Sequence, residues 1–484
     1  IAKFKARWVV KGYEQLYGID YDQTFAGVAK TQSWKILMAI ATLYDLEIKQ
    51  MDAITAFLQG ESNKGIHVEL PNGYQGDDNN VAFLLKTLYG LKQSLWMWQE
   101  KLCSELGKLG YRPMQADHCL YTTEDGLQGI IIVTYVDDFL LIGPDIKAIN
   151  ELKSKLNDVF SMKDLGPCSM FLGVRLVRDW KNHTTHLIQD QYAEKVLYAF
   201  NLQDAKPVYT PMEVSILKEM ILNTRQATLS DIKIYQSGVG SLMYPMTQSW
   251  PDLSFTVSIL SRFSHNPAPI HWEVCKRAIV YFRTTKGLGI TFNADNAKDW
   301  LNYHGFSDSD YAGDVETRKS TSGYVYFMAN GPVLWKTAQQ HAVTLSSTEV
   351  EYYALTEAAK EAKWHQTFLK ELQYSGADAK PTMLYGDNTG SLSLAENPEH
   401  HSWAKHIDVW QHYIHQEVQE GLIELAYICT DQMAVDRLTK PLSRVKHEAF
   451  IKQLGMERFK PKLPSPGHDR PYAWTGSQSI TVVN

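Results

Sequence analysis

Two adjacent acids, Asp137 and Asp138, interrupt a mostly apolar stretch that runs from Ile132 to Ile142. Burying unpaired carboxylates is costly, and two neighbouring carboxylates also repel each other. The β-branched flanks predict a hairpin that carries the pair at its turn, at the mouth of a cleft. Divalent cations would neutralise both charges, because Mg²⁺ takes oxygen ligands and pairs of such ions drive displacement at phosphorus. On this segment alone, a plain acidic turn between strands stays open as the alternative.

A third acid upstream favours the metal interpretation. Asp52 lies in a half-apolar, strand-like stretch that runs from Leu46 to Gly60. The chain between Asp52 and Asp137 is long enough for a helix-rich excursion and a return to the same sheet. Three carboxylates brought together in this way would suit a two-metal centre for phosphoryl transfer.

The second half of the chain carries another dispersed set of acids. Asp308 belongs to a predicted strand, and Glu351 lies on a predicted helix over residues 346–372. Asp387 ends a later apolar strand, and Asp436 heads a final helix. Four acids delivered by different elements can surround two metal ions. Surface carboxylates are common, so spacing alone leaves a solvated acidic face equally open.

Composition sets broad limits on the class of protein. A chain of 484 residues, 44% hydrophobic and 21% charged, is too long for one core and predicts two or three globular domains. Its net charge of −6 argues against a general polyanion-binding protein, so nucleic-acid affinity would depend on local basic patches. Its five cysteines form no CxxC or metal-binding spacing, which favours a reducing compartment. No apolar run approaches the length of a membrane span.

Several strings around these acids occur together in one known family. Met51–Gly60 and Tyr135–Asp138 surround the first acids, and Leu88–Ser94 and Phe160–Gly173 follow in the same order. With these motifs the chain resembles the reverse transcriptase of Ty1/copia-type retrotransposons. The strings around Asp308, Glu351, Asp387 and Asp436 resemble the RNase H domain of the same family, with Asp436 in the most divergent string.

The resemblance implies an α+β right-hand polymerase with fingers, palm and thumb, followed by an α/β RNase H-like domain. Polar and proline-rich segments, together with the matched motifs, place the expected domain boundaries. We expect fingers and palm at 1–180, thumb and connection at 181–295, the RNase H-like domain at 300–445, and a largely disordered tail at 446–484. Ile1 falls inside a finger strand by resemblance, so we expect the fingers to be truncated at the N-terminus and the chain to be a fragment or a truncated gene model.

The resemblance also assigns roles in the first centre. Asp52 and Asp137 would hold two Mg²⁺ (or Mn²⁺) ions, with Asp138 supporting them. Phe57 would lie under the sugar of the incoming nucleotide and Gln93 would contact that nucleotide, although a core aromatic and a plain loop glutamine remain alternatives. Lys5 and Arg7 are candidates for the triphosphate, with a solvated strand face as the alternative.

In the second centre, Asp308, Glu351, Asp387 and Asp436 match the metal-binding acids of the family. The implied activity is RNA-directed DNA polymerisation with RNase H cleavage. The implied partners are an RNA template, a DNA primer, an RNA/DNA hybrid and dNTPs, with no membrane and with an oligomeric state that the sequence does not indicate. The implied location is intracellular, in a cytoplasmic virus-like particle or the nucleus.

The rival hypothesis is a degenerate, inactive remnant that retains only nucleic-acid binding. Where the family pattern has arginine, this chain has Trp96, Trp250, Trp403 and Trp410, and Leu95 replaces a proline. Such changes are each reachable by one C-to-T mutation. Tryptophan cannot supply the fixed charge and the donor fork of arginine. We therefore expect that polymerisation suffers first and that RNase H cleavage outlasts it.

Overall fold

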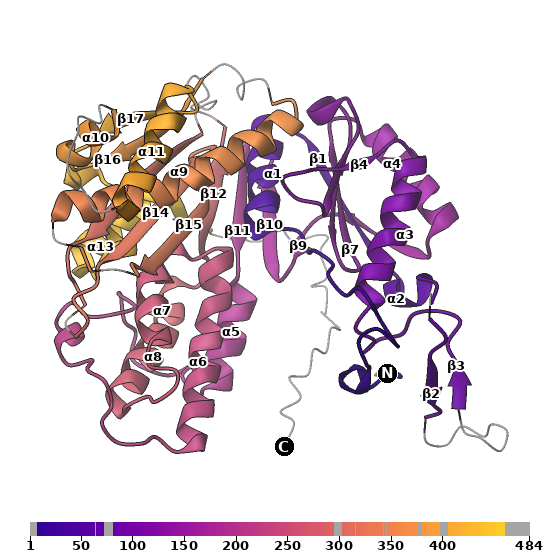
Figure 1. Cartoon of the computed structure of the whole chain (residues 1–484), viewed down its shortest axis with the longest axis horizontal. Coiled ribbons are helices and arrows are strands. Elements are labelled where there is room, and N and C mark those ends of the chain that lie inside the picture. Colours follow the sequence, from indigo (N-terminus) through magenta and orange to yellow (C-terminus); the bar gives the residue numbers. More distant parts are fainter. Residues whose placement is uncertain are drawn as a thin grey trace, which may run out of the picture.

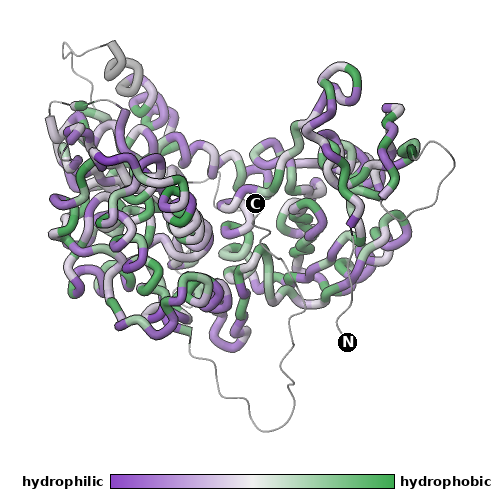
Figure 2. Tube along the Cα trace, turned by 90° about the horizontal axis from the view of Figure 1, so that it is seen from below, coloured by the Kyte–Doolittle hydropathy of each residue, from purple (hydrophilic) through white to green (hydrophobic). Residues whose placement is uncertain are grey.

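The computed structural model describes residues 7–62, 64–71, 81–294, 303–314, 316–341, 343–344, 346–374, 380–396 and 405–459. Within these residues the chain trace forms two bodies that lie side by side and are joined in the middle (Figure 2). Three larger sheets and a separate two-stranded ribbon organise them. No helix in the described ranges is both long enough and apolar enough to cross a membrane.

The first sheet has six strands in the order β4-β5-β6-β7-β1-β8. Their bounds are β1 Glu47–Ala53, β4 Arg112–Pro113, β5 Leu120–Thr122, β6 Ile131–Tyr135, β7 Asp138–Gly143 and β8 Met162–Pro167. The β6–β7 pair is antiparallel, which confirms the hairpin expected around Asp137 and Asp138. Its residues are almost all buried, because both faces of the hairpin are covered by other parts of the chain.

Helices cover this sheet, and a small ribbon extends from it on the right of Figure 1. The elements are η1 Gly12–Glu14, α1 Thr31–Leu43, α2 Ala56–Gln59, β2 His67–Glu69, β3 Val81–Phe83, α3 Ser94–Lys108, η2 Gly126–Gln128 and α4 Ile146–Val159. Helix α4 begins where the Asp145 carboxylate accepts a hydrogen bond from the Lys147 backbone N–H, a standard N-cap. Helix α1 is buried along most of its length, since it lies between the first sheet and the rest of the molecule.

The second sheet has the order β18-β12-β11-β10-β9 and is flanked by a helical group. Its elements are β9 Met170–Phe171, β10 Val174–Asp179, β11 Thr184–Ile188, α5 Asp190–Ala199, η3 Ser215–Lys218, α6 Leu229–Gln248, η4 Pro251–Leu253, α7 Ser254–Ser261, α8 Pro269–Thr285 and β12 Leu288–Asn293. The expected boundary at residue 180 is wrong, because it cuts the β10–β11 hairpin. Strand β12 pairs along β11, so the second sheet continues after the helices.

The third sheet has the order β15-β14-β13-β16-β17, with β13, β16 and β17 mutually parallel. Its elements are β13 His304–Asp310, β14 Thr321–Met328, β15 Gly331–Gln339, α9 Ser347–Glu371, β16 Thr382–Gly386, α10 Thr389–Glu396, α11 Lys405–Gln419, β17 Ile423–Tyr427, η5 Thr430–Gln432 and α12 Asp436–Thr439. The helix expected over 346–372 is present, and the Ser346 hydroxyl caps it by accepting from the Glu349 backbone N–H.

The C-terminal segment corrects another prediction. Residues 446–459 do not belong to a disordered tail, because α13 Arg444–Gln453 and β18 Met456–Arg458 pack on the body. Strand β18 pairs with β12 of the second sheet, and His447 is fully buried with its Nε2 at 2.7 Å from the Tyr281 hydroxyl. Residues 460–484 lie outside the described residues, so the prediction of a tail stays a prediction for them.

Helix α9 ties the third sheet to the first. The Glu371 carboxylate accepts hydrogen bonds from the backbone N–H groups of Gln115 and Ala116, and Trp364 donates its indole N–H to the Ala116 carbonyl. The Lys30 ammonium lies 4.7 Å from the centre of the Trp364 ring. One hydrophobic cluster also runs through both parts. The part of the chain that forms the third sheet is therefore packed directly against the first sheet.

Candidate active sites

The first site is built on the β1–β7 pair, where Asp52 lies opposite Asp138 in the antiparallel register. Asp137 occupies the β6–β7 turn, and its carbonyl accepts a hydrogen bond of 2.7 Å from the Ala53 N–H. The neighbouring Val136 has a φ of +59°, a strained value for a β-branched residue. Its carbonyl is held at 2.8 Å by the Trp98 indole. The fold thus imposes this turn and places the three predicted acids at one end of the sheet.

Burial and charge repulsion act on Asp138. Its pKa rises to about 6, first because it is desolvated and then because Asp137 and Asp52 lie near it. The Gln50 side chain donates a hydrogen bond of 3.3 Å to one Asp138 oxygen and opposes the rise. Asp138 is therefore less readily ionised than an exposed aspartate, and its supporting role stays a prediction.

Two aromatic rings stand beside these acids. The pKa of Tyr89 rises because it is partly buried and because Asp137 and Asp52 lie within electrostatic range. Phe57, on α2, packs edge-on against Tyr89 with ring centres 4.8 Å apart. The Arg7 guanidinium lies 5.6 Å from the centre of the Tyr89 ring. Phe57 and Arg7 thus contact the same Tyr89 ring whose pKa responds to Asp52 and Asp137.

Two other predicted nucleotide contacts are not assembled here. Gln93 is buried, and its side chain accepts from Gln15 and donates to the Asp20 carbonyl. It orders the loop that precedes α3, and its contact with a nucleotide stays a prediction. Lys5 lies outside the described residues.

The second site is more tightly assembled. Asp308, Glu351 and Asp387 each offer a carboxylate oxygen, and these three atoms lie within 4.8 Å of one another. The parallel pairing of β13 with β16 explains part of this convergence, because Asp308 lies near the end of β13 and Asp387 directly follows β16. Helix α9 packs on β13 and delivers Glu351 from its first turns. Within the described part of the chain, three acids meet this closely here and not in the first site.

The charges of the second site are poorly compensated. Burial, followed by the charges of Asp308 and Asp387, raises the pKa of Glu351 to about 9. Burial also raises the pKa of Asp308 to about 6, with smaller contributions from Asp436 and Asp387. Carboxylates held together in this way suit a divalent cation, whose charge would stabilise their ionised forms. The donor set therefore fits the Mg²⁺ or Mn²⁺ that the sequence predicted.

Asp436 lies at the margin of this group. It begins α12, and one of its oxygens is 2.6 Å from the Lys440 ammonium. Its charge contributes to the raised pKa of Asp308, so it faces the acid cluster without belonging to the closest three.

Sequence reasoning missed two polar partners of this site. The Thr439 hydroxyl donates a hydrogen bond of 2.6 Å to Asp308, and the Lys440 ammonium lies beside Asp436 and within electrostatic range of Asp308 and Asp387. The charges of Asp436, Asp308 and Asp387 raise the pKa of Lys440. Both residues follow Asp436 within one helical turn, so their spacing was the available signal.

Comparisons with known proteins identify the family of this chain. Residues 1–214 match the family described as reverse transcriptase (RNA-dependent DNA polymerase). A Pol polyprotein from the transposon TNT 1-94 of Nicotiana tabacum is 38% identical over 94% of this chain and 34% of that protein. A transposon Ty5-1 protein of Saccharomyces cerevisiae is 33% identical over 64% of this chain and 100% of its own length. The chain belongs to the copia-type retrotransposon reverse transcriptase family.

This copia-type chain spans about a third of the length of the larger Pol relatives, including one from the transposon RE1 of Arabidopsis thaliana that is 35% identical. Its fold is the expected right-hand polymerase followed by an RNase H-like domain. A foamy viral protease-reverse transcriptase in complex with double-stranded DNA gives a TM-score of 0.43 at 12% identity, over 81% of this chain and 59% of that one. That likeness is distant, and the family assignment does not depend on it.

Proposed function

We propose that this chain extends a DNA primer on an RNA or DNA template and cleaves the RNA strand of an RNA/DNA hybrid. Asp52 and Asp137 would bind the cations of the first site, and Asp308, Glu351, Asp387 and Asp436 those of the second. Bound Mg²⁺ or Mn²⁺ would stabilise charge that develops on the transferred phosphoryl group.

The convergence of Asp308, Glu351 and Asp387 supports this function most strongly. Three acids from separate elements, with raised pKa values for Asp308 and Glu351, are costly for a fold to hold together without a cation. In the first site, the side chains around Asp52 and Asp137 would orient the nucleotide. The Phe57 ring would exclude a 2′-hydroxyl, and Arg7 would approach the triphosphate.

The test is to measure primer extension and hybrid cleavage separately on the same preparations. Asp52→Asn should abolish extension and leave hybrid cleavage within about twofold, whereas Asp308→Asn should do the reverse. Asp158→Asn, at an exposed position of α4, is the matched control and should change neither activity. If both activities persist in both variants, these acids are not the catalytic sites.

A second candidate function is binding without polymerisation, as expected of a degenerate copy. Trp250, one of the residues that depart from the family pattern, is fully buried, stacks on Phe282 at 4.4 Å and donates to the Leu288 carbonyl. Tryptophan at position 250 is therefore well packed, and it gives no structural sign of decay. Leu95, in contrast, packs beside the first site next to Gln93. Repair of Leu95→Pro and Trp96→Arg should restore extension if decay has occurred, and leave it unchanged otherwise.

A further inference from the structure

Lys440 follows the short helix α12 as its C-terminal cap residue, beside the acids of the second site. Its ammonium lies 2.6 Å from one Asp436 oxygen, and its side chain keeps 43% of its surface exposed. Its backbone N–H donates a hydrogen bond of 3.2 Å to the Asp436 carbonyl and closes the turn between the two residues. The acid that lies outside the closest three is therefore held by a cation of the chain itself.

The turn that carries Lys440 is fixed against the acid cluster. The Thr439 hydroxyl donates a hydrogen bond of 2.6 Å to Asp308. Helix α12 also packs on β14 at Gly323, which pairs with Asp308 in the sheet. A Cβ at Gly323 would lie 2.9 Å from the Leu438 Cβ, so glycine is required for this close approach. The backbone of Lys440 is therefore fixed beside the acids, while its side chain stays partly exposed.

The Lys440 ammonium acts on each acid of the site. The charges of Asp436, Asp308 and Asp387 raise the pKa of Lys440, which keeps it protonated. In return Lys440 lowers the pKa of Asp308 and of Glu351, against the larger effect of their burial. The four carboxylates and the ammonium thus form one electrostatic group, in which oxygens of Asp308, Glu351 and Asp387 lie within 4.8 Å of one another.

The charges of this group limit how many cations it holds. One divalent cation would leave the four ionised carboxylates and the ammonium with a single negative charge. A second divalent cation would leave a single positive charge, which is unfavourable where the acids are largely buried. A phosphate diester carries one negative charge and would restore neutrality. The balance therefore favours one cation in the free chain, and a second cation only together with a phosphate.

We propose that Lys440 holds Asp436 in the free chain, so that the second site takes one divalent cation until a phosphate diester of nucleic acid arrives. The first cation would bind Asp308, Glu351 and Asp387. With the phosphate present, a second cation would replace the ammonium at Asp436, and the partly exposed Lys440 would turn toward the phosphate. This inference rests on the proposed function, because it takes the four acids as cation ligands.

The first experiment counts the Mn²⁺ ions bound to the nucleic-acid-free chain by electron paramagnetic resonance. Every sample carries Asp52→Asn and Asp137→Asn, which exclude the first site, and this parent chain should bind one ion tightly. Lys440→Met should bind a second ion at least about fivefold more tightly than the parent chain does, and the two neighbouring ions should give a dipolar signal. Lys440→Arg keeps the charge and should bind one ion, as the parent chain does.

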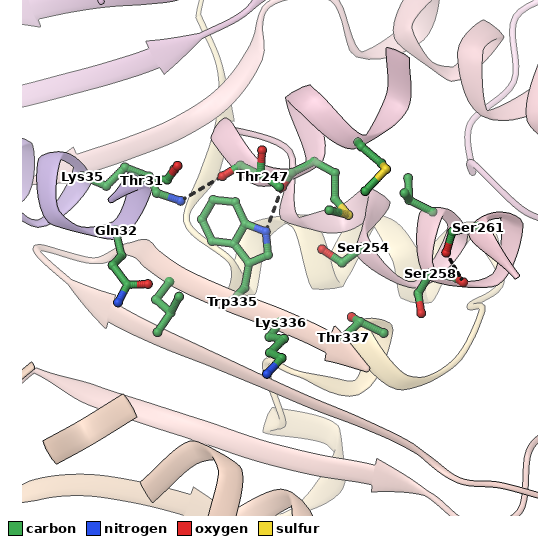
Figure 3. A pocket seen from close by; sticks show the side chains of 14 residues that line it. Thr31, Gln32, Lys35, Thr247, Ser254, Ser258, Ser261, Trp335, Lys336 and Thr337 are labelled. Carbon is green, nitrogen blue, oxygen red and sulfur yellow. Dashed lines mark hydrogen bonds between the residues drawn. The ribbon is translucent and has the colours of Figure 1, made fainter. Parts of the chain in front are cut away.

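Lys336→Met is the matched control. The Lys336 ammonium also lies near a carboxylate, that of Glu357 at 3.9 Å, and the Lys336 side chain is 49% exposed. Lys336 lies on β15 and lines a separate cavity of about 410 Å³ between α1, α6, α7 and β15, whose described lining contains none of the four acids (Figure 3). Its replacement should leave one bound ion. Melting curves identify any variant that fails to fold.

The second experiment tests the dependence on phosphate. The same samples receive an RNA/DNA hybrid whose RNA strand carries 2′-fluoro groups and resists cleavage. Asp308→Asn with this hybrid gives the background from ions bound to nucleic acid alone. The dipolar signal should appear in the parent chain only when the hybrid is present, whereas Lys440→Met should give it in both cases.

Three results would each overturn the proposal: a dipolar signal in the free parent chain, its absence when the hybrid is present, or a Lys440→Met variant that binds one ion as the parent chain does. If the parent chain binds no Mn²⁺ at all, the proposed function fails and this inference fails with it. Neither experiment needs catalysis, so an inactive chain would still give a decisive result.

Discussion

The two acid sites of this molecule differ in how completely the fold assembles them. In the RNase H-like site, carboxylate oxygens of Asp308 on β13, Glu351 on α9 and Asp387 just after β16 lie within 4.8 Å of one another. The pKa values of Asp308 and Glu351 rise to about 6 and about 9. In the polymerase site, the three acids do not approach so closely, and Asp138 is the one whose pKa rises, to about 6. The acids of the RNase H-like site are therefore close enough together to bind a cation in the chain as it stands.

The difference follows from where the acids lie in each sheet. Asp308 and Asp387 come from neighbouring parallel strands, whose carboxyl ends meet at one edge, and α9 brings Glu351 to the same edge. Asp137 instead lies in a hairpin turn, beside Asp138 and next to the strained Val136. The fold alone therefore brings the acids of the RNase H-like site closer together than those of the first site.

The largest effect should come from Asp137. Asp137→Asn should reduce primer extension at least about 10³-fold, because it removes a formal charge and an oxygen ligand where charge develops in the transition state. Hybrid cleavage should stay within about twofold of wild type. Asp158→Asn serves as the control, and near wild-type extension by Asp137→Asn would show that the polymerase site lies elsewhere.

The next effect is a pH dependence of metal-induced stabilisation. Because the pKa of Glu351 is higher in the folded chain than in the unfolded chain, protonation of Glu351 favours folding. This stabilisation is complete below about pH 4.5 and is lost as the pH rises through about 9. Without metal, stability should therefore fall across this range. The rise in melting temperature on adding Mg²⁺ should grow from pH 6 to pH 9 by several degrees. A rise that is constant or shrinks over that range would contradict the account.

Glu351→Gln should sharpen the same comparison. The amide cannot ionise, so the metal-free variant should be more stable than wild type at pH 8 by roughly 1–3 kcal/mol. Most of the Mg²⁺-dependent stabilisation should disappear. Glu424→Gln, at an exposed position of β17, is the control. Denaturant unfolding with EDTA and with Mg²⁺ measures both effects. A metal-free variant that is less stable than wild type would contradict the view that burial and the neighbouring acids make ionised Glu351 unfavourable.

Lys440→Met should have the smallest effect. The Lys440 ammonium offsets the acids of the RNase H-like site from 2.6 Å beside Asp436, but it is partly exposed and screened by solvent. Its removal should lower metal-free stability by about 1 kcal/mol, and Mg²⁺ should recover the loss. A loss of the same size with and without Mg²⁺ would mean that Lys440 acts through packing alone.

The sequence predicted the elements that carry dense local patterns. The apolar flanks of Asp137 and Asp138 required a hairpin, and the capped helix over 346–372 is almost entirely as expected. Motifs also located the acids of both sites. Their distances could not be predicted, because these depend on the pairing of β13 with β16, which lie far apart in the sequence.

The wrong predictions share a physical cause. The tail prediction rested on the Pro-, Gly-, Ser- and charge-rich composition that begins near Met456, but α13 and β18 pack on the body and bury Phe450 and Met456. The boundary at residue 180 failed because the pairing of β10 with β11 across it cannot be seen in the sequence. The position of Lys35 was also missed because it depends on distant elements. A lysine on an otherwise apolar helix gives no sign of the cavity that it lines (Figure 3).

Manganese binding by the nucleic-acid-free chain tests the central comparison most directly. Titration followed by electron paramagnetic resonance should show saturable Mn²⁺ binding in wild-type protein at pH 8. Asp308→Asn should weaken that binding at least about tenfold, and Asp52→Asn should leave it unchanged. If Asp52→Asn instead weakens Mn²⁺ binding as much as Asp308→Asn does, the RNase H-like site is not the preassembled one.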